Sequence, residues 1–274
     1  MTSESIAFIG GGNMAGSMIG GVLAQGWNAE NIWASDPDPA TRTRLASLGI
    51  HVTEHNREAA AAASIVVLAV KPQQLRSACM EVAPSVAERG SLVISIAAGV
   101  ETASLQSWIG PGAAIVRCMP NTPALLQCAA SVMFATGNVS AIQRRSAHAV
   151  LESIGSATWV DREELLHAVT ALSGSGPAYF FLVMEAMQLV GETLGLEPEL
   201  SRQLTAQTAL GAARMALESD VDVVELRRRV TSPGGTTERA LRVFEERGLR
   251  RLFEAALTAA ANRSRELAAE LGQA

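Results

Sequence analysis

The stretch Ile6-Ala7-Phe8-Ile9-Gly10-Gly11-Gly12-Asn13-Met14-Ala15-Gly16 decides the fold. Its four apolar residues indicate a buried parallel strand, and the apolar positions within 18–23 indicate one face of a helix. In this spacing Gly10 permits a tight turn, Gly12 leaves room for a pyrophosphate, and Ala15 allows close packing of the helix on the strand. The stretch predicts a dinucleotide-binding unit, with a plain glycine turn as the alternative.

Further apolar stretches predict more strands, and their ends are marked by small residues, glycine or proline. The expected strands cover residues 31–35, 64–70, 92–96 and 114–118, and 130–135 and 157–160 are expected to extend the sheet, with a helix over 140–153. This alternation predicts a doubly wound α/β sheet, in which ligands lie at the carboxyl ends of the strands. Lys71, Ala97, Ala98 and Asn121 are therefore expected to line one crevice, with ordinary loop roles as the alternative.

The end of the second strand bears on the choice of cofactor. An acid such as Asp36 normally accepts a hydrogen bond from the ribose 2′-hydroxyl of NAD, whereas the hydroxyl of Ser35 can contact a 2′-phosphate. Asp36 is also a candidate N-cap before Pro37. We interpret Arg42 and Arg44 as a solvated helix face, although a cation there could reach a 2′-phosphate. Local evidence leaves the choice open.

From Glu163 onward the pattern changes to periods near 3.6, which predicts an all-helical domain. We expect a dinucleotide-binding domain over residues 1–160 and a helical domain over 161–274. The long pattern 163–194 is interrupted by Ser173-Gly174-Ser175-Gly176-Pro177, where small residues suit tight packing or a ligand and the proline favours a kink. Further helices are expected over 198–217, 238–247 and 249–271, with a turn or two over 221–226.

The stretch Thr231-Ser232-Pro233-Gly234-Gly235-Thr236-Thr237-Glu238 is expected to open a helix. Unpaired N–H groups and the helix dipole attract an anion to such an end, and the threonine hydroxyls can donate hydrogen bonds. The stretch alone is more typical of an N-cap between two helices. Together with a dinucleotide turn in the same chain, it becomes a candidate carboxylate site.

Composition and charge argue against several classes of function. The net charge of −5 and the aromatic content of 4% argue against nucleic-acid binding. The longest apolar run, 59–70, is shorter than the ~20 residues that span a bilayer, and the start Met1-Thr2-Ser3-Glu4-Ser5 lacks the basic flank of a signal peptide. We therefore expect a cytoplasmic protein with no nucleic-acid or membrane partner.

The cysteines and histidines indicate neither disulfides nor a metal site. Cys79, Cys118 and Cys128 are expected to be reduced and buried. The four histidines, His51, His55, His148 and His167, lack metal-ligand spacing, so no metal is expected. His167 is expected to be packed or exposed, with a catalytic role as the alternative.

Five stretches together resemble pyrroline-5-carboxylate reductases, the enzymes of the last step of proline biosynthesis. They are Ile9 to Ala15, Leu68-Ala69-Val70-Lys71-Pro72, Arg117 to Pro123, Leu172 to Tyr179, and Val230 to Thr237. They span nearly the whole chain in order, and the last two are specific to the family. The resemblance implies a Rossmann-like domain followed by an all-α dimerisation domain. It also implies a homodimer through the helical domain and higher rings such as a decamer.

The resemblance also implies roles at matching positions. Gly10, Gly11, Gly12, Asn13 and Met14 would hold the pyrophosphate, and Ser35 and Asn56 would contact the adenosine ribose and its 2′-phosphate. Val70, Lys71, Pro72, Ala97, Ala98 and Asn121 would complete the site of NADPH, with NADH as the alternative. Ser232, Thr236 and Thr237 would bind the substrate carboxylate and ring nitrogen, and Glu163 would lie on the substrate side. Two departures are Asp36, whose charge disfavours a 2′-phosphate, and Arg229, whose role is not carried over.

The implied reaction is reduction of 1-pyrroline-5-carboxylate to L-proline by hydride transfer from NAD(P)H. We expect Ser232 and Thr237 as the catalytic residues, with Thr237 bonded to the ring nitrogen and the proton arriving on the substrate or through water. A β-hydroxy-acid reductase, or a reductase of another imine, would typically use a lysine in the helical half, and no lysine follows Lys71. A non-catalytic dinucleotide-binding protein would have no need of the 232–237 stretch.

Overall fold

The computed structural model describes residues 4–273, and its contacts divide the chain into two compact units. The first unit comprises Met1–Ser175 with Ala259–Ala274, and the second comprises Gly176–Thr258. These compact units do not follow the expected boundary at residue 160, so the functional division into 1–160 and 161–274 stays a prediction. Most of the N-terminal segment considered for a signal peptide, residues 1–3, lies outside the described residues, as does residue 274.

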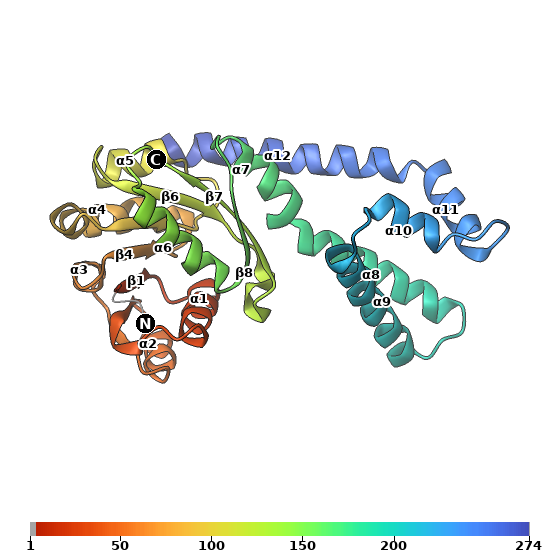
Figure 1. Cartoon of the computed structure of the whole chain (residues 1–274), viewed down its shortest axis with the longest axis horizontal. Coiled ribbons are helices and arrows are strands. Elements are labelled where there is room, and N and C mark those ends of the chain that lie inside the picture. The colour runs from red at the N-terminus through yellow and green to blue at the C-terminus, as the bar shows by residue number, and fades with distance from the viewer. Residues whose placement is uncertain (1–3, 274) are drawn as a thin grey trace. The chain divides into compact units, whose positions relative to one another are not determined.

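The first unit is built on one eight-stranded sheet with helices on both faces (Figure 1). The strands are β1 Ile6–Ile9, β2 Ile32–Ser35, β3 His51–Thr53, β4 Ile65–Leu68, β5 Leu92–Ser95, β6 Ala114–Met119, β7 Ala129–Ala135 and β8 Gly155–Trp159. They are ordered β3-β2-β1-β4-β5-β6-β7-β8. The helices of this region are α1 Asn13–Ala24, α2 Pro39–Ala46, α3 Asn56–Ala61, α4 Pro72–Arg89, α5 Thr102–Ile109 and α6 Ala141–Glu152. The predicted doubly wound sheet is confirmed.

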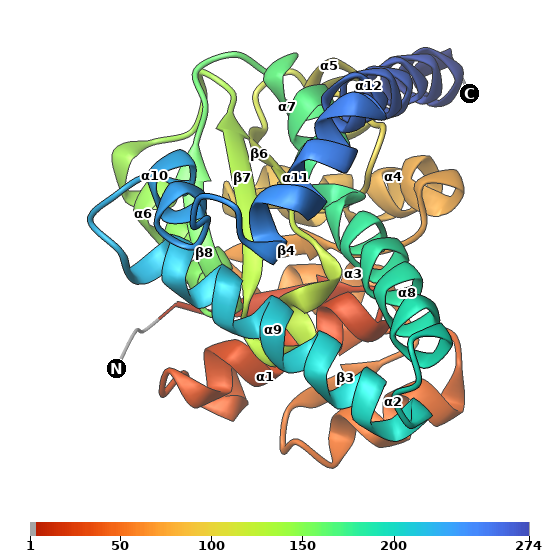
Figure 2. The same ribbon diagram turned by 90° about the vertical axis from the view of Figure 1, so that its right-hand side faces the viewer.

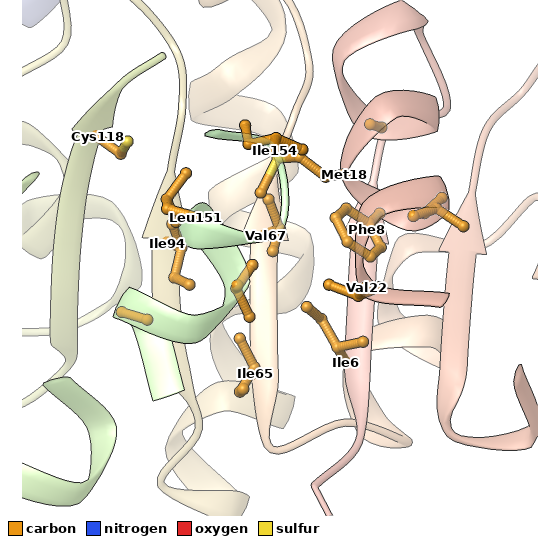
Figure 3. Close-up of a cluster of buried hydrophobic side chains, with 14 of the residues drawn as sticks. Ile6, Phe8, Met18, Val22, Ile65, Val67, Ile94, Cys118, Leu151 and Ile154 are labelled. Carbon is orange, nitrogen blue, oxygen red and sulfur yellow. The ribbon is translucent and has the colours of Figure 1, made fainter. Parts of the chain in front are cut away.

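The continuous apolar runs form strands because both faces of the sheet are covered. Along β1, Ile6 and Phe8 pack with α1 and α6, whereas Ala7 and Ile9 pack with α3, α4 and α5. Figure 3 shows the first of these cores, where Phe8 of β1 lies among side chains of the sheet and of α1. The alternation of β1 therefore places apolar side chains in both cores, and its carboxyl end leads directly into the glycine turn.

Two features of the sheet were not predicted. Strand β3 pairs in parallel with β2 at the edge of the sheet, and its three residues are exposed or half-buried, so they lack an apolar run. Strand β7 runs antiparallel to β6, although every other neighbouring pair among the described strands is parallel. A local apolar pattern predicts a strand but not its direction, so this reversal could not be inferred.

The region of Ser173 to Pro177 contains a π-helical segment over Thr170–Gly174, between α7 (Leu165–Val169) and α8 (Gly176–Thr193). The Ser175 N–H donates to the Thr170 carbonyl oxygen at 2.8 Å. A Cβ on Gly174 would lie 2.4 Å from Cε at the flexible end of the Met119 side chain, so Met119 packs closely on this segment. This result supports the expected tight packing.

The second unit is helical (Figure 2). It contains α8, α9 (Pro198–Glu218), α10 (Val223–Arg229), α11 (Thr236–Glu246) and the first part of α12 (Leu249–Gln273), whose remainder belongs to the first unit. The helical run Leu165–Thr193 is long and apolar enough to cross a bilayer by length and composition alone, and 22% of its apolar window is buried. Much apolar surface of this unit is therefore left open in the single chain.

Candidate active site

The glycine turn after β1 has an open helix N-terminus. Gly10 has a φ of +96°, and a Cβ there would lie 2.9 Å from the carbonyl oxygen of Ala69, so this position requires glycine. A Cβ on Gly12 would meet no atom within 4 Å. Helix α1 begins at Asn13 with neither a side-chain cap nor an acidic residue in its first turn. The N–H groups at this end can therefore bind an anion, and the turn fits the pyrophosphate of a dinucleotide.

Asp36 binds the glycine turn. The Gly11 N–H donates to Asp36 Oδ2 at 2.8 Å, and the Asp38 N–H donates to Asp36 Oδ1 at 2.9 Å. Helix α2 is capped by Asp38, whose carboxylate accepts from the N–H groups of Ala40 and Thr41. The alternative of Asp36 as the N-cap is therefore wrong. Its carboxylate instead fixes the end of β2 beside the glycine turn.

The guanidinium groups of Arg42 and Arg44 turn back onto the backbone near this turn. Arg44 Nη2 donates to the Gly11 carbonyl oxygen at 2.6 Å, and Arg42 Nη1 donates to those of Asp36 and Pro37 at 2.7 and 2.8 Å. Arg44 is exposed, as the expected solvated helix face requires, whereas the Arg42 side chain is 21% exposed and also lies 3.6 Å from a Glu54 carboxylate oxygen. The positive charges lie where they favour an anionic ligand.

Side chains from three elements meet at the end of β2. Ser35 is fully buried, and its Oγ donates to Asn56 Oδ1 at 2.7 Å. Asn56 Nδ2 donates in turn to Oε2 of Glu81, on α4, at 2.8 Å. The structure thus brings together Ser35 and Asn56, the two residues expected at the ribose. Sequence reasoning missed Glu81, because a glutamate in the middle of a helix carries no local signal for such a contact.

The other expected cofactor residues lie at the carboxyl ends of strands. Val70, Lys71 and Pro72 follow β4, and Lys71 is the residue before the first residue of α4. Ala97 is buried and Ala98 is exposed in the loop after β5. A Cβ on the neighbouring Gly99 would lie 3.3 Å from the side chain of Leu271, so the end of α12 packs against this loop.

Asn121 follows β6, and its side-chain amide bonds two other segments of the first unit. Its Nδ2 donates to the Ser173 carbonyl oxygen at 3.0 Å, and its Oδ1 accepts from the Ala130 N–H at 2.9 Å. The side chain thus joins the loop after β6 to the start of β7 and to the π-helical segment. These bonds indicate a positioning role for the amide.

Glu163 belongs to a network that sequence reasoning did not anticipate. Its carboxylate accepts from Thr102 N and Oγ1 at 2.8 and 2.5 Å and from Arg117 Nη1 at 2.8 Å. The Arg117 side chain is only 4% exposed, so the ion pair compensates a buried charge. Thr102 is the first residue of α5, just beyond the loop that contains Ala97. Glu163 therefore ties the end of β6 to the start of α5.

His167 lies close to this network. It is buried, with Nδ1 2.9 Å from Ser264 Oγ and Nε2 3.5 Å from a Glu101 carboxylate oxygen. Burial first, and then the charge of Arg117, lower the pKa of His167, and the Glu101 carboxylate opposes this shift. The ring is therefore a packed neutral histidine near neutral pH, as the packing interpretation expects.

The Thr231–Glu238 stretch forms an open helix end in the second unit. Gly234 has a φ of +71°, and α11 begins at Thr236 after Gly235, which provides no side-chain cap. The Glu238 side chain instead accepts from the Gly234 N–H at 2.9 Å. Within residues 4–273, the hydroxyls of Ser232, Thr236 and Thr237 make no hydrogen bond. The stretch therefore offers free N–H and O–H donors.

The candidate residues lie in both units. The cofactor candidates and Glu163 belong to the first unit, whereas Ser232, Thr236 and Thr237 belong to the second. The cysteines are free, and burial raises the pKa of Cys79 to about 12 and also raises that of Cys118. Cys128 is exposed, so its expected burial is wrong. Across the described part of the chain, no three His, Cys, Asp or Glu side chains gather in a metal-binding cluster.

Comparison with known proteins agrees with this geometry. A family model described as pyrroline-5-carboxylate reductase dimerisation matches residues 163–267, and one described as NADP oxidoreductase, coenzyme F420-dependent, matches residues 5–99. The chain is 53% identical to the pyrroline-5-carboxylate reductase of Pseudomonas aeruginosa over 274 residues, which is 100% of both chains.

Two solved structures extend the likeness to the fold. A pyrroline-5-carboxylate reductase from Coxiella burnetii has a TM-score of 0.94 and 45% identity, and the match covers 97% of this chain and 99% of that one. The Plasmodium falciparum enzyme with NADP bound has a TM-score of 0.86 and 28% identity over 98% and 99% of the two chains. The chain therefore belongs to the pyrroline-5-carboxylate reductase family of NAD(P)H-dependent oxidoreductases.

Proposed function

We propose that this protein reduces 1-pyrroline-5-carboxylate to L-proline with NAD(P)H, as the last step of proline biosynthesis. The observation that carries the proposal is the uncapped start of α11, where N–H groups and free hydroxyls offer a carboxylate site. The same chain has a second uncapped helix end at the glycine turn, which suits a dinucleotide. An enzyme that transfers a hydride from a dinucleotide to an anionic imine needs both kinds of site.

The cofactor is proposed to bind along the carboxyl ends of the strands. Its pyrophosphate would lie on the turn of Gly10, Gly11, Gly12, Asn13 and Met14, and its adenosine ribose at Ser35 and Asn56. Its nicotinamide half would lie beside Val70, Lys71, Pro72, Ala97, Ala98 and Asn121. Bound there, the reduced nicotinamide supplies the hydride for the imine carbon. The open space at Gly12 and the missing side-chain cap of α1 support this assignment.

The substrate is proposed to bind through Ser232, Thr236 and Thr237. The N–H groups at the start of α11 and the hydroxyls of Ser232 and Thr236 would hold its carboxylate, and Thr237 would bond the ring nitrogen. A protonated imine keeps its proton when its carbon is reduced, so these residues need to orient the ring rather than donate a proton. The bonds that occupy the Glu163 carboxylate support a role in positioning the substrate-side loop rather than direct contact.

A homodimer through the helical half, with rings such as a decamer built from dimers, completes the proposal. The match of residues 163–267 to a dimerisation family supports it, as do the many exposed apolar side chains of α8. A partner on these side chains would explain the apolar character of the run Leu165–Thr193 without a membrane. We also propose a cytoplasmic location, which the unpaired thiols of Cys79 and Cys118 support.

The direct test is oxidation of NADPH, and separately of NADH, by the purified protein with pyrroline-5-carboxylate as substrate. We expect a loss of reduced-nicotinamide absorbance that depends on the imine and yields proline in equal amount. Activity on β-hydroxy acids without activity on the imine would overturn the proposal in favour of a related reductase. Cofactor binding without turnover of either substrate would indicate a non-catalytic protein.

A further inference from the structure

Glu81 orients an amide beside the expected ribose site from a position outside the glycine turn. Its Oε2 accepts a hydrogen bond of 2.8 Å from Asn56 Nδ2. Asn56 Oδ1 accepts a hydrogen bond of 2.7 Å from Ser35 Oγ. The backbone of Ser35 reaches the glycine turn, because its carbonyl oxygen accepts from the Gly10 N–H at 2.8 Å. A chain of three side chains therefore links α4 to the end of β2.

The order of donors and acceptors in this chain follows from Glu81. A carboxylate only accepts hydrogen bonds, so the Asn56 amide must turn its NH₂ group toward Glu81 and its oxygen toward Ser35. The Ser35 hydroxyl must then donate its one hydrogen to Asn56. Ser35 Oγ is left with lone pairs only, and it can accept from a ligand but cannot donate to one.

This order discriminates between two ligand groups. In dinucleotide-binding units the adenosine ribose lies at the end of the second strand, where Ser35 and Asp36 are found. A 2′-hydroxyl can donate to Ser35 Oγ, whereas a 2′-phosphate has acceptor oxygens that need a donor. The second hydrogen of Asn56 Nδ2 can bond either group. The nearby arginines, Arg42 and Arg44, donate to backbone carbonyl groups, and neither makes a hydrogen bond to Glu81, so a substitution of Glu81 leaves their charge unchanged.

We propose that Glu81 is a specificity-determining residue that favours the 2′-hydroxyl of NADH over the 2′-phosphate of NADPH by fixing the Asn56 amide. The inference rests on the proposed function, whose cofactor is the ligand concerned. In Glu81→Gln the new amide can donate as well as accept, so Asn56 can turn over and offer its NH₂ group to Ser35. The Ser35 hydrogen is then free for a phosphate oxygen.

The experiment measures dissociation constants of NADPH and NADH for the full-length protein by the fluorescence of the reduced nicotinamide, without substrate. We expect Glu81→Gln to shift the ratio of the two constants about ten- to a hundredfold in favour of NADPH, the range of one hydrogen bond to a charged group. Glu88→Gln is the matched control, because Glu88 is exposed on the same helix and makes no bond to Asn56. It should leave the ratio within about twofold.

A double-mutant cycle separates the amide from the charge. Removal of the Glu81 charge alone would favour NADPH in any background, whereas an effect through the amide needs Asn56. We therefore expect the shift caused by Glu81→Gln to disappear in Asn56→Ala. The proposal would be overturned if Glu81→Gln left the ratio unchanged, or if it shifted the ratio equally with and without Asn56→Ala in the background. It would also be overturned if the wild type bound neither cofactor. Failure to reduce pyrroline-5-carboxylate would sink the proposed function but leave these ratios measurable.

Discussion

Gly10 and Gly12 lie two residues apart in the same turn, but a different constraint requires glycine at each position. Gly10 needs a positive φ and has no room for a Cβ, whereas a Cβ on Gly12 would project into open space. We predict that Gly12→Val abolishes NAD(P)H binding, because its side chain fills the place of the pyrophosphate, while the melting temperature stays near that of the wild type. Fluorescence titration and thermal unfolding measure the two effects.

Gly10→Ala is the contrasting variant. The strain of an alanine at positive φ and its contact with Ala69 should cost about 1–3 kcal/mol of unfolding free energy. Urea unfolding should therefore detect Gly10→Ala, and cofactor titration should detect Gly12→Val. Tight cofactor binding by Gly12→Val would contradict the assignment of the turn.

Thr237 has a free hydroxyl at the start of α11, where the substrate ring nitrogen is proposed to bind. We predict that Thr237→Ala lowers kcat/KM for pyrroline-5-carboxylate by about ten- to a hundredfold, which corresponds to one hydrogen bond to a charged group. The dissociation constant of the cofactor should not change. Steady-state kinetics and cofactor titration measure the two quantities.

Thr231→Ala is the matched control for this hydroxyl. Thr231 belongs to the same stretch, but its Oγ1 already donates to the Arg227 carbonyl oxygen at 2.6 Å. Its loss should lower stability slightly and leave kcat/KM for the imine unchanged. If both alanine variants lowered kcat/KM equally, the effect would come from the conformation of the stretch and not from the Thr237 hydroxyl.

At the scale of elements, the strands that sequence patterns predicted are those buried on both faces. Strands β1, β4 and β5 are short apolar runs between two layers of helices, and the pattern records that burial directly. Strand β3 was not predicted, because its residues His51, Val52 and Thr53 lie at the exposed edge of the sheet and form no apolar run. The pattern thus records burial, and it carries no information on edge pairing or on the reversed direction of β7.

The residues of the candidate site were predictable only where the signal is local in the sequence. The glycine turn and the start of α11 are local sequence signals, and they were found at the predicted positions. Arg117 and Glu81 act through residues that are 46 and 25 positions away in the chain, Glu163 and Asn56. No single-sequence pattern encodes such a pairing, because it arises from the sheet order and from helix packing.

The ion pair of Arg117 and Glu163 leads to a prediction about how the elements of the first unit are held together. We expect Glu163→Ala to destabilise the protein by about 3 kcal/mol, because it leaves the buried Arg117 charge without its partner and α5 without its contact at Thr102. Glu164→Ala is the control, since Glu164 pairs with Arg162 at the surface. Urea unfolding should separate the two variants, and equal stabilities would show that the network contributes little.

The lowered pKa of His167 predicts how stability depends on pH. The unfolded chain takes up a proton near pH ~6.5, whereas the folded ring binds it only at lower pH. Stability is therefore retained above about pH 6.5 and is lost as the pH falls through the lower, folded-state pKa. His167→Asn should melt with a shallower pH slope than the wild type between about pH 7 and 5, and an unchanged slope would contradict this source of the pH dependence.

At the scale of the whole molecule, the single chain leaves an apolar surface that a soluble monomer rarely shows. On α8 the exposed apolar side chains include Phe180, Phe181, Leu182, Val183, Met187, Leu189 and Val190. Sequence periodicity predicted the helix but not which of its faces would lack an intrachain partner. A second copy of this chain is the partner that the dimerisation family favours.

Phe181 tests this dimer, because its side chain is 64% exposed in the single chain and lies on α8. We predict that Phe181→Glu converts the protein to monomers in analytical ultracentrifugation. Loss of a buried phenylalanine costs about 1.5–3 kcal/mol, and a two-fold interface contains two copies. Ile142→Glu is the matched control, since Ile142 is also 64% exposed but lies on α6 of the first unit. If both variants sedimented as the wild type does, the apolar surface of α8 would not be the dimer interface, and its exposure would need another partner.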